Sequence, residues 1–70
     1  MLKSKIGEVI ESKGLKHKWV AEKVGVYPTV LSRWINNRGK PSLERIFKLA
    51  HVLNCKVDDL YTYEDDPLQK

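Results

Sequence analysis

Short blocks of apolar residues at helical spacing, separated by glycine and proline, constrain this sequence more than any other feature. In the first block the apolar residues lie at i, i+4, i+7 and i+8, the spacing of one helix face; they are Leu2, Ile6, Val9 and Ile10. Gly14 comes after this block, as a glycine comes after many helix C-termini. The sequence therefore predicts a first helix over residues 3–13.

The middle of the chain predicts three further helices. A second apolar block ends at Gly25, and Pro28, whose fixed φ suits a first helical turn, predicts a third helix over residues 28–36. Ser42 is a typical N-cap and Asn54 a typical residue after a helix end, so we expect a fourth helix between them. The apolar residues of these three helices are Trp19, Val20, Ala21 and Val24; Val30, Leu31, Trp34 and Ile35; and Leu43, Ile46, Phe47, Ala50 and Leu53.

The end of the chain predicts one more element. Val57, Leu60 and Tyr61 indicate a last short helix. In the turn before the fourth helix, Asn37 is expected in the left-handed conformation, which Asn tolerates. The sequence shows no convincing strand alternation and no internal repeat. We therefore expect an all-α fold, a compact bundle of five short helices.

Length and cysteine content limit the class of protein. Seventy residues make one domain, which we place at residues 1–61, followed by an acidic, flexible tail over residues 62–70 that contains Pro67. A single cysteine excludes an internal disulfide and suits a reducing cytosol. We see no apolar run typical of a signal peptide or a membrane helix, and so expect a cytoplasmic protein.

Charge is distributed unevenly along the chain. Residues 1–56 hold twelve of the thirteen Lys and Arg and four acidic residues, a net charge of +8. Residues 57–70 hold five acidic residues and one Lys, a net charge of −4. A basic body with an acidic end fits a polyanionic partner for the body, although a well-solvated surface would explain the same charges.

Residues 17–34 carry the most informative geometry. Ala21 is small enough to let two helices cross closely, and Gly25 permits a positive φ in the turn between them. Val26 is expected to fold back into the core, while Leu31 and Trp34 anchor the second of the two helices from beneath. The other side of that helix is then left facing outward.

This ordered set of residues resembles the Cro/repressor-type helix-turn-helix family, also called XRE-like or lambda-repressor-like. The resemblance covers about residues 3–63 without a gap. The matching residues are Gly14-Leu15, Val20-Ala21-Glu22-Lys23-Val24-Gly25-Val26, Leu31-Ser32-Arg33-Trp34, Pro41-Ser42-Leu43-Glu44, Leu49-Ala50 through Leu53, and Val57-Asp58-Asp59-Leu60-Tyr61. It implies a sequence-specific regulator of transcription that binds double-stranded DNA, and it favours a repressor. It also implies a homodimer, which can form on the DNA itself, that binds a two-fold operator.

The resemblance places the third predicted helix in the major groove, where the N-terminal half of such a helix reads base edges. The residues expected to contact bases are Tyr27, Pro28, Thr29, Ser32 and Arg33. Arg33 is the strongest of them, because a guanidinium matches the O6/N7 pair of guanine. Residues expected on phosphates flank this helix and are Lys16, His17, Lys18, Asn36, Asn37, Arg38 and Lys40.

Several positions depart from the usual family pattern, among them Asn37, which replaces a common Gly. His17 stands where many members have Gln, and Pro28 stands where many have a polar side chain that reads a base. Ile10 and Ile35 occupy positions that often hold a basic and an acidic residue. Since apolar residues can replace a buried ion pair without loss of stability, we predict that Ile10 and Ile35 touch.

Other classes of function find less support in the sequence. His51 and Cys55 lie at i, i+4, but two ligands are too few for a structural zinc site, so no metal and no cofactor is expected. No catalytic arrangement of Ser, Cys or His is credible, so the chain is not expected to be an enzyme. The alternatives that remain are an antitoxin-like module that docks a partner protein through the C-terminal segment, and a non-specific binder of nucleic acid.

Overall fold

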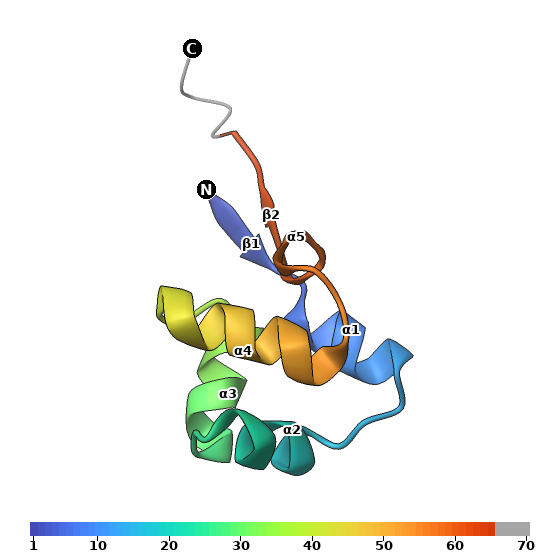
Figure 1. Cartoon of the computed structure of the whole chain (residues 1–70). Coiled ribbons are helices and arrows are strands. Elements are labelled where there is room, and N and C mark those ends of the chain that lie inside the picture. Colours follow the sequence, from blue (N-terminus) through green and yellow to red (C-terminus); the bar gives the residue numbers. More distant parts are fainter. Residues whose placement is uncertain (66–70) are drawn as a thin grey trace.

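The computed structural model describes residues 1–65 and contains five helices and a two-stranded sheet (Figure 1). In chain order the elements are β1 (Leu2–Ser4), α1 (Ile6–Ser12), α2 (His17–Val24), α3 (Pro28–Ile35), α4 (Leu43–Leu53), α5 (Val57–Leu60) and β2 (Tyr61–Tyr63). The five expected helices are therefore confirmed, and the helices alone form the body of the molecule.

The prediction of a purely helical fold is wrong at the two ends of the body. β1 pairs with β2 in antiparallel fashion, with Leu2 opposite Tyr63 and Ser4 opposite Tyr61. The first helix accordingly begins at Ile6 rather than at residue 3. Leu2 shares the helical spacing of Ile6, but its partner strand lies about sixty positions away, where a local pattern cannot detect it.

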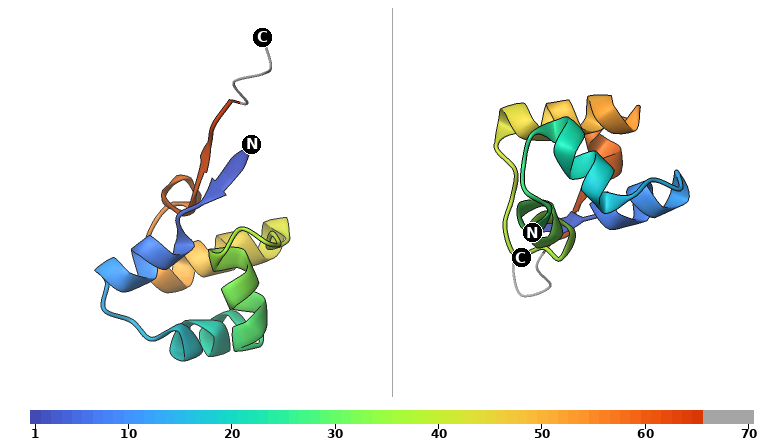
Figure 2. Two further views of the ribbon diagram at one scale, coloured as in Figure 1. Left: turned by 180° about the vertical axis from the view of Figure 1, so that it is seen from behind. Right: turned by 90° about the horizontal axis from the view of Figure 1, so that it is seen from below.

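The boundary predicted at residue 61 also changes in detail. Thr62 and Tyr63 belong to β2, so the chain does not become loose directly after Tyr61. Residues 66–70 of the expected tail lie outside the described residues. We call the ribbon formed by residues 2–4 and 61–63 the arm. Figure 1 and the left view of Figure 2 both show the molecule from the side. In both, the arm extends away from the helices on the side opposite to α2.

The helix ends follow the local signals in the sequence. Gly14, Asn37 and Asn54 all have a positive φ, of 67°, 60° and 54°. The Ser42 hydroxyl accepts a hydrogen bond from the backbone N–H of Arg45 at 3.3 Å, which makes Ser42 the N-cap of α4. These caps confirm the predicted left-handed turn at Asn37 and both ends of the fourth helix.

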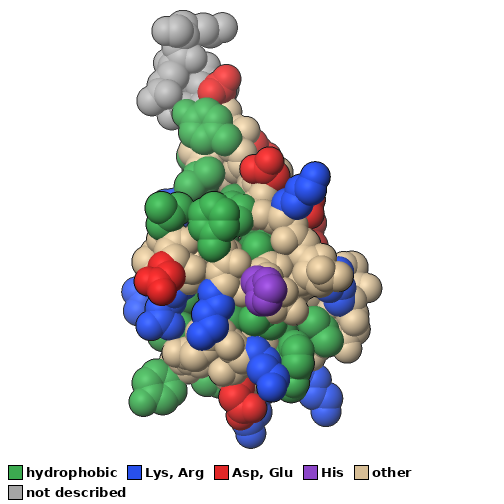
Figure 3. Space-filling model, viewed as in Figure 1, with side chains coloured by type: hydrophobic (Ala, Val, Ile, Leu, Met, Phe, Trp, Pro, Cys, Tyr) green, Lys and Arg blue, Asp and Glu red, His purple; other side chains and the backbone are tan. Residues whose placement is uncertain are grey.

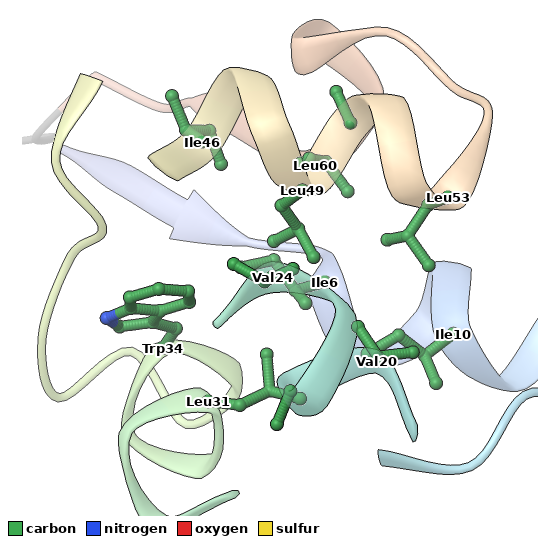
Figure 4. Close-up of a cluster of buried hydrophobic side chains, with 12 residues drawn as sticks. Ile6, Ile10, Val20, Val24, Leu31, Trp34, Ile46, Leu49, Leu53 and Leu60 are labelled. Atoms are coloured by element: carbon green, nitrogen blue, oxygen red, sulfur yellow. The ribbon is translucent and has the colours of Figure 1, made fainter. Parts of the chain in front are cut away.

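The core combines residues of all five helices (Figure 4). Its buried residues are Ile6, Ile10, Val20, Ala21, Val24, Leu31, Trp34, Ile46, Leu49, Ala50, Leu53 and Leu60. Trp19, one of the apolar residues of α2, is 42% exposed. The predicted apolar stripe of α4 is wrong at Leu43 and Phe47, which are 75% and 59% exposed. Leu49 is the fully buried residue of α4 that the predicted stripe omitted.

Neither Ile10 nor Ile35 faces solvent freely. Ile10 is buried, and Ile35 is half-buried against the core. Their direct contact stays a prediction. The side chain of Ile35 does lie close to Gly7 of α1. No helix within residues 1–65 is long and apolar enough to cross a membrane.

Candidate nucleic-acid interface

The turn between α2 and α3 fixes the position of the candidate interface. Ala21 is completely buried, and Gly25 ends α2 with a φ of 89°, in the left-handed region that favours glycine. The backbone N–H of Val26 donates to the carbonyl of Ala21 at 3.0 Å, and the half-buried Val26 side chain packs against the core. The chain therefore reverses within a few residues and presents α3 at an angle to α2 (Figure 1).

An arginine of α4 holds the same turn from outside. The Nη1 atom of Arg45 donates a hydrogen bond to the carbonyl of Gly25 at 3.2 Å. The sequence indicated no such role for Arg45. The contact joins residues twenty positions apart, so only the fold shows that α4 supports the turn.

A close contact with α1 sets the position of α3 from the other end. A Cβ atom added at Gly7 would lie 2.9 Å from Cγ2 of Ile35, closer than real Cβ atoms come to other atoms. The absence of a side chain at Gly7 therefore lets α1 and α3 approach each other. Sequence reasoning missed Gly7, because it lies inside a helix and far in sequence from Ile35.

One side of α3 points into the core and the other is open to solvent. Leu31 is fully buried and Trp34 is 5% exposed, and both project from α3 into the cluster of Figure 4. The five residues predicted to contact bases are all exposed: Tyr27, Pro28, Thr29, Ser32 and Arg33. Tyr27, at the N-cap of α3, is 79% exposed. The structure thus brings the predicted base-reading residues together on one face.

A shallow polar pocket lies at the C-terminal half of this face. It is lined by Ser32, Arg33, Asn36 and Arg38. The Nδ2 atom of Asn36 donates to the carbonyl of Ser32 at 3.0 Å and lies 3.3 Å from its hydroxyl oxygen. Because the Ser32 oxygen accepts this bond, its own O–H hydrogen remains free to be donated to a ligand.

Basic residues flank α3 on two sides. Lys16, His17 and Lys18 are exposed at the start of α2, and Arg38 and Lys40 are exposed in the turn that follows α3. Lys16, the N-cap of α2, makes no side-chain capping bond, so the first N–H groups of α2 point to solvent. His17 also lines a pocket with two acidic residues of α1, Glu8 and Glu11.

Asn37 is placed differently from the other residues predicted on phosphates. Its side-chain Nδ2 donates to the carbonyl of Leu2 in β1 at 3.3 Å. The amide therefore ties the turn after α3 to the arm. Asn36, its neighbour, bonds within α3. The structure gives Asn37 a role in the fold that its position in the sequence did not indicate.

Figure 3 shows Lys and Arg side chains distributed over the helical body, and hydrophobic side chains gathered on the arm and at its base. Cys55, half-buried after α4, packs against the core, and burial raises the pKa of its thiol. Among residues 1–65 no group of three or more His, Cys, Asp or Glu could hold a metal ion.

Comparison with known proteins identifies the family of this arrangement. The model of a family described as helix-turn-helix matches residues 6–60, from the start of α1 to the end of α5. The chain belongs to the helix-turn-helix family. The resemblance to its Cro/repressor, or XRE, type is thereby confirmed, and α2 and α3 are the two helices that give the family its name.

Individual relatives agree with this assignment. An "Uncharacterized HTH-type transcriptional regulator" of Archaeoglobus fulgidus is 28% identical over 67 residues, 96% of each chain. A second, YvzC of Bacillus subtilis, is 38% identical over 45 residues, 64% of this chain and 58% of its own. Among solved structures, a "putative DNA-binding protein" of Bacteroides fragilis has a TM-score of 0.83 and 32% identity, covering 89% of this chain and all of its own.

Proposed function

We propose that this helix-turn-helix protein is a sequence-specific regulator of transcription that binds double-stranded DNA and inserts α3 into the major groove. One observation carries the proposal. α3 is anchored by Leu31 and Trp34 on its inner side, while its outer side exposes Thr29, Ser32 and Arg33 together. The names of the relatives, which include a transcriptional regulator and a DNA-binding protein, support it.

The exposed side chains supply complementary means of reading bases. Arg33 offers two parallel N–H donors, which match the O6 and N7 acceptors of guanine. The Ser32 hydroxyl, which accepts from Asn36, can donate its hydrogen to a base acceptor. Pro28 has no side-chain donor, but its ring offers an apolar contact for a thymine methyl group. Thr29 can supply either a hydroxyl or a methyl group.

Phosphate contacts would fix the orientation of α3 in the groove. Lys16 and Lys18 lie at the start of α2, and Arg38 and Lys40 follow α3, so positive charge flanks the reading helix on both sides. The uncapped N–H groups of α2 add backbone donors beside Lys16. Affinity should therefore fall steeply as the salt concentration rises.

A two-fold operator follows from the small size of the reading surface. One copy places only α3 in the groove, so two copies on half-sites about 10–10.5 base pairs apart would give a longer recognised sequence. A homodimer bound over a promoter would block the access of other proteins, which favours repression over activation. No catalytic role is part of this proposal.

In vitro selection of bound duplexes from a random library, at fixed salt, tests the proposal directly. We expect enrichment of a two-fold motif whose half-sites are one helical turn apart. A matched selection with Arg33→Ala should lose its preference at one base pair of each half-site. If no motif is enriched although duplexes are retained, the protein is a non-specific binder and the regulator assignment is wrong.

A further inference from the structure

The start of α3 differs from the rest of its outer face, because it exposes rings rather than hydrogen-bonding groups. Tyr27, the N-cap of α3, is 79% exposed, and Pro28, the first residue of the helix, is exposed as well. We call Tyr27 and Pro28 the tip of α3. Apart from the Tyr27 hydroxyl, the tip is an apolar surface.

The backbone at the start of α3 offers few donors to a ligand. The N–H groups of Val30 and Leu31 both donate to the carbonyl of Tyr27, at 2.9 and 3.2 Å, and Pro28 has no N–H. Among the first four residues of α3, only Thr29 then has an N–H without an acceptor within residues 1–65. The start of the helix is therefore poorly suited to bind acceptors of a base or a phosphate through its backbone.

The surroundings of the tip continue its apolar surface and hold it in place. A hollow of about 360 Å³ lies beside the tip, and its mostly apolar lining consists of Gly25, Val26, Tyr27, Val30, Trp34 and Arg45. The guanidinium of Arg45 donates to the carbonyl of Gly25 at 3.2 Å. Because Gly25 lies two residues before Tyr27, this hydrogen bond restrains the backbone that carries the tip.

The C-terminal half of the outer face of α3 has the opposite character. Ser32 and Arg33 line a polar pocket there, together with Asn36 and Arg38. At a rise of 1.5 Å per residue, Arg33 lies about 7.5 Å along the helix axis from Pro28, which is roughly two base-pair steps of B-DNA. The apolar tip and the polar half of α3 can therefore contact different base pairs of one half-site.

The major groove offers one kind of apolar group to such a tip. Its base edges present hydrogen-bond donors and acceptors, and thymine adds a 5-methyl group. 5-Methylcytosine carries the same methyl group at the same ring position, whereas cytosine and uracil carry only hydrogen there. A ring that covers this methyl group removes apolar surface from water, which favours binding of the methylated base.

We propose that the tip of α3 binds the 5-methyl group of one pyrimidine in each half-site, either thymine or 5-methylcytosine. The rings of Pro28 and Tyr27 cover the methyl group, so the protein distinguishes methylated from unmethylated pyrimidines at this position. Because the tip reaches a base only when α3 enters the groove, this proposal rests on the proposed function. If Arg33 binds a guanine, the methyl group lies about two base pairs from it.

Parallel in vitro selections with the full chain test the DNA side, at fixed salt and from three random duplex libraries. The first library contains the ordinary bases, the second has uracil in place of thymine, and the third has 5-methylcytosine in place of cytosine. The first should enrich a motif with thymine at one defined position, the second should lose that preference, and the third should accept 5-methylcytosine there. On the selected operator, replacing this thymine by uracil in one half-site should weaken binding about three- to fivefold, the effect of one buried methyl group.

Protein variants test whether the tip is responsible. The double variant Tyr27→Ala, Pro28→Ser should bring the ratio of the affinities for the thymine and uracil operators close to one. Tyr27→Phe keeps the ring and should keep the ratio. Arg33→Ala is the matched control, because it should weaken binding to both operators and leave their ratio unchanged. Circular dichroism checks that the helices of each variant remain folded, and the measurements on the unmodified chain do not depend on these variants.

Three results would contradict the methyl contact at the tip and leave the proposed function standing. The same motif from the thymine and uracil libraries would show that no methyl group is bound. A ratio that survives the double variant would place the contact on another residue, such as Thr29. A response to thymine without one to 5-methylcytosine would exclude the recognition of methylated cytosine. By contrast, a first library that yields no motif at all would overturn the proposed function itself.

Discussion

The outer face of α3 and the edge of β2 are both open to solvent, but they are open in different ways. On α3 the backbone is satisfied within the helix, and polar side chains such as Ser32 and Arg33 are exposed. On β2 the backbone groups of Tyr61 and Tyr63 point outward, and the exposed side chain of Tyr63 is largely apolar. The first surface offers side-chain donors, and the second offers a backbone template.

This difference indicates different partners. A rigid helix with exposed donors and flanking positive charge is suited to a polyanion whose bases present a fixed pattern of acceptors. An open strand edge is suited to another extended chain, because only a strand can pair with a row of alternating N–H and C=O groups. The proposed DNA contact therefore uses side chains of α3, whereas the edge of β2 exposes backbone groups.

The largest effect should come from the anchor beneath α3. Leu31→Ala should lower the free energy of unfolding by about 2–5 kcal/mol, because Leu31 is fully buried and its removal leaves a cavity. Leu2→Ala, on the arm, should cost below about 1 kcal/mol, since Leu2 is partly exposed. Urea denaturation followed by circular dichroism measures both. Equal losses would show that the arm is as integral to the fold as the core.

Arg33→Ala should separate sequence reading from general affinity. Loss of a bidentate contact should cost about 1–3 kcal/mol on the selected operator and much less on scrambled duplex. Arg38→Ala, the matched control in the turn after α3, should weaken binding to both duplexes alike and reduce the salt slope by about 1. Titrations at several salt concentrations measure both effects. If Arg33→Ala weakens both duplexes equally, Arg33 is a phosphate contact.

Gly7→Ala should disturb the position of α3 and leave the arm intact. The new methyl group would meet Cγ2 of Ile35, and such overpacking costs about 1–3 kcal/mol of stability. Ile35→Leu, which has no Cγ2 atom, should recover part of this loss in the double variant, and the double-mutant cycle measures the coupling. Additive losses would mean that the contact between α1 and α3 does not limit how closely they pack.

Much of the helical body could be predicted because its signals are local. Gly25 and Asn54 end helices through their own backbone conformations, and Ser42 begins one through its hydroxyl. The periodicity of α3 was also sufficient to place Leu31 and Trp34 inside and Arg33 outside. Each of these features is decided by residues within a few positions of one another.

The arm could not be predicted, because it depends on a pairing between the two ends of the chain. Each strand has only three residues, too few to establish an alternating pattern. The contacts that join the arm or the turn to the body, from Asn37 to Leu2 and from Arg45 to Gly25, likewise connect distant positions. The exposure of Phe47 could not be predicted for a related reason, since helical spacing alone does not show where the buried face of α4 ends.

The smallest expected effect concerns a single hydroxyl in the arm. The Tyr61 hydroxyl is buried and lacks a well-formed hydrogen bond within residues 1–65. Burial raises the pKa of Tyr61 above its usual value near 10, and the nearby Ser4 hydroxyl offsets only part of this rise. Because the folded state favours the neutral phenol, this contribution to stability is complete below pH 10 and is lost as the pH rises through the raised pKa.

Tyr61→Phe should therefore change stability by less than about 1 kcal/mol at neutral pH, since it removes a buried group that has little to bond. It should also flatten the alkaline decline in the free energy of unfolding, measured by urea titrations on both sides of the usual tyrosine pKa. Tyr63→Phe is the matched control and should keep the decline, because Tyr63 is exposed. A decline that persists in Tyr61→Phe would assign the alkaline loss to groups outside the packed part of the arm.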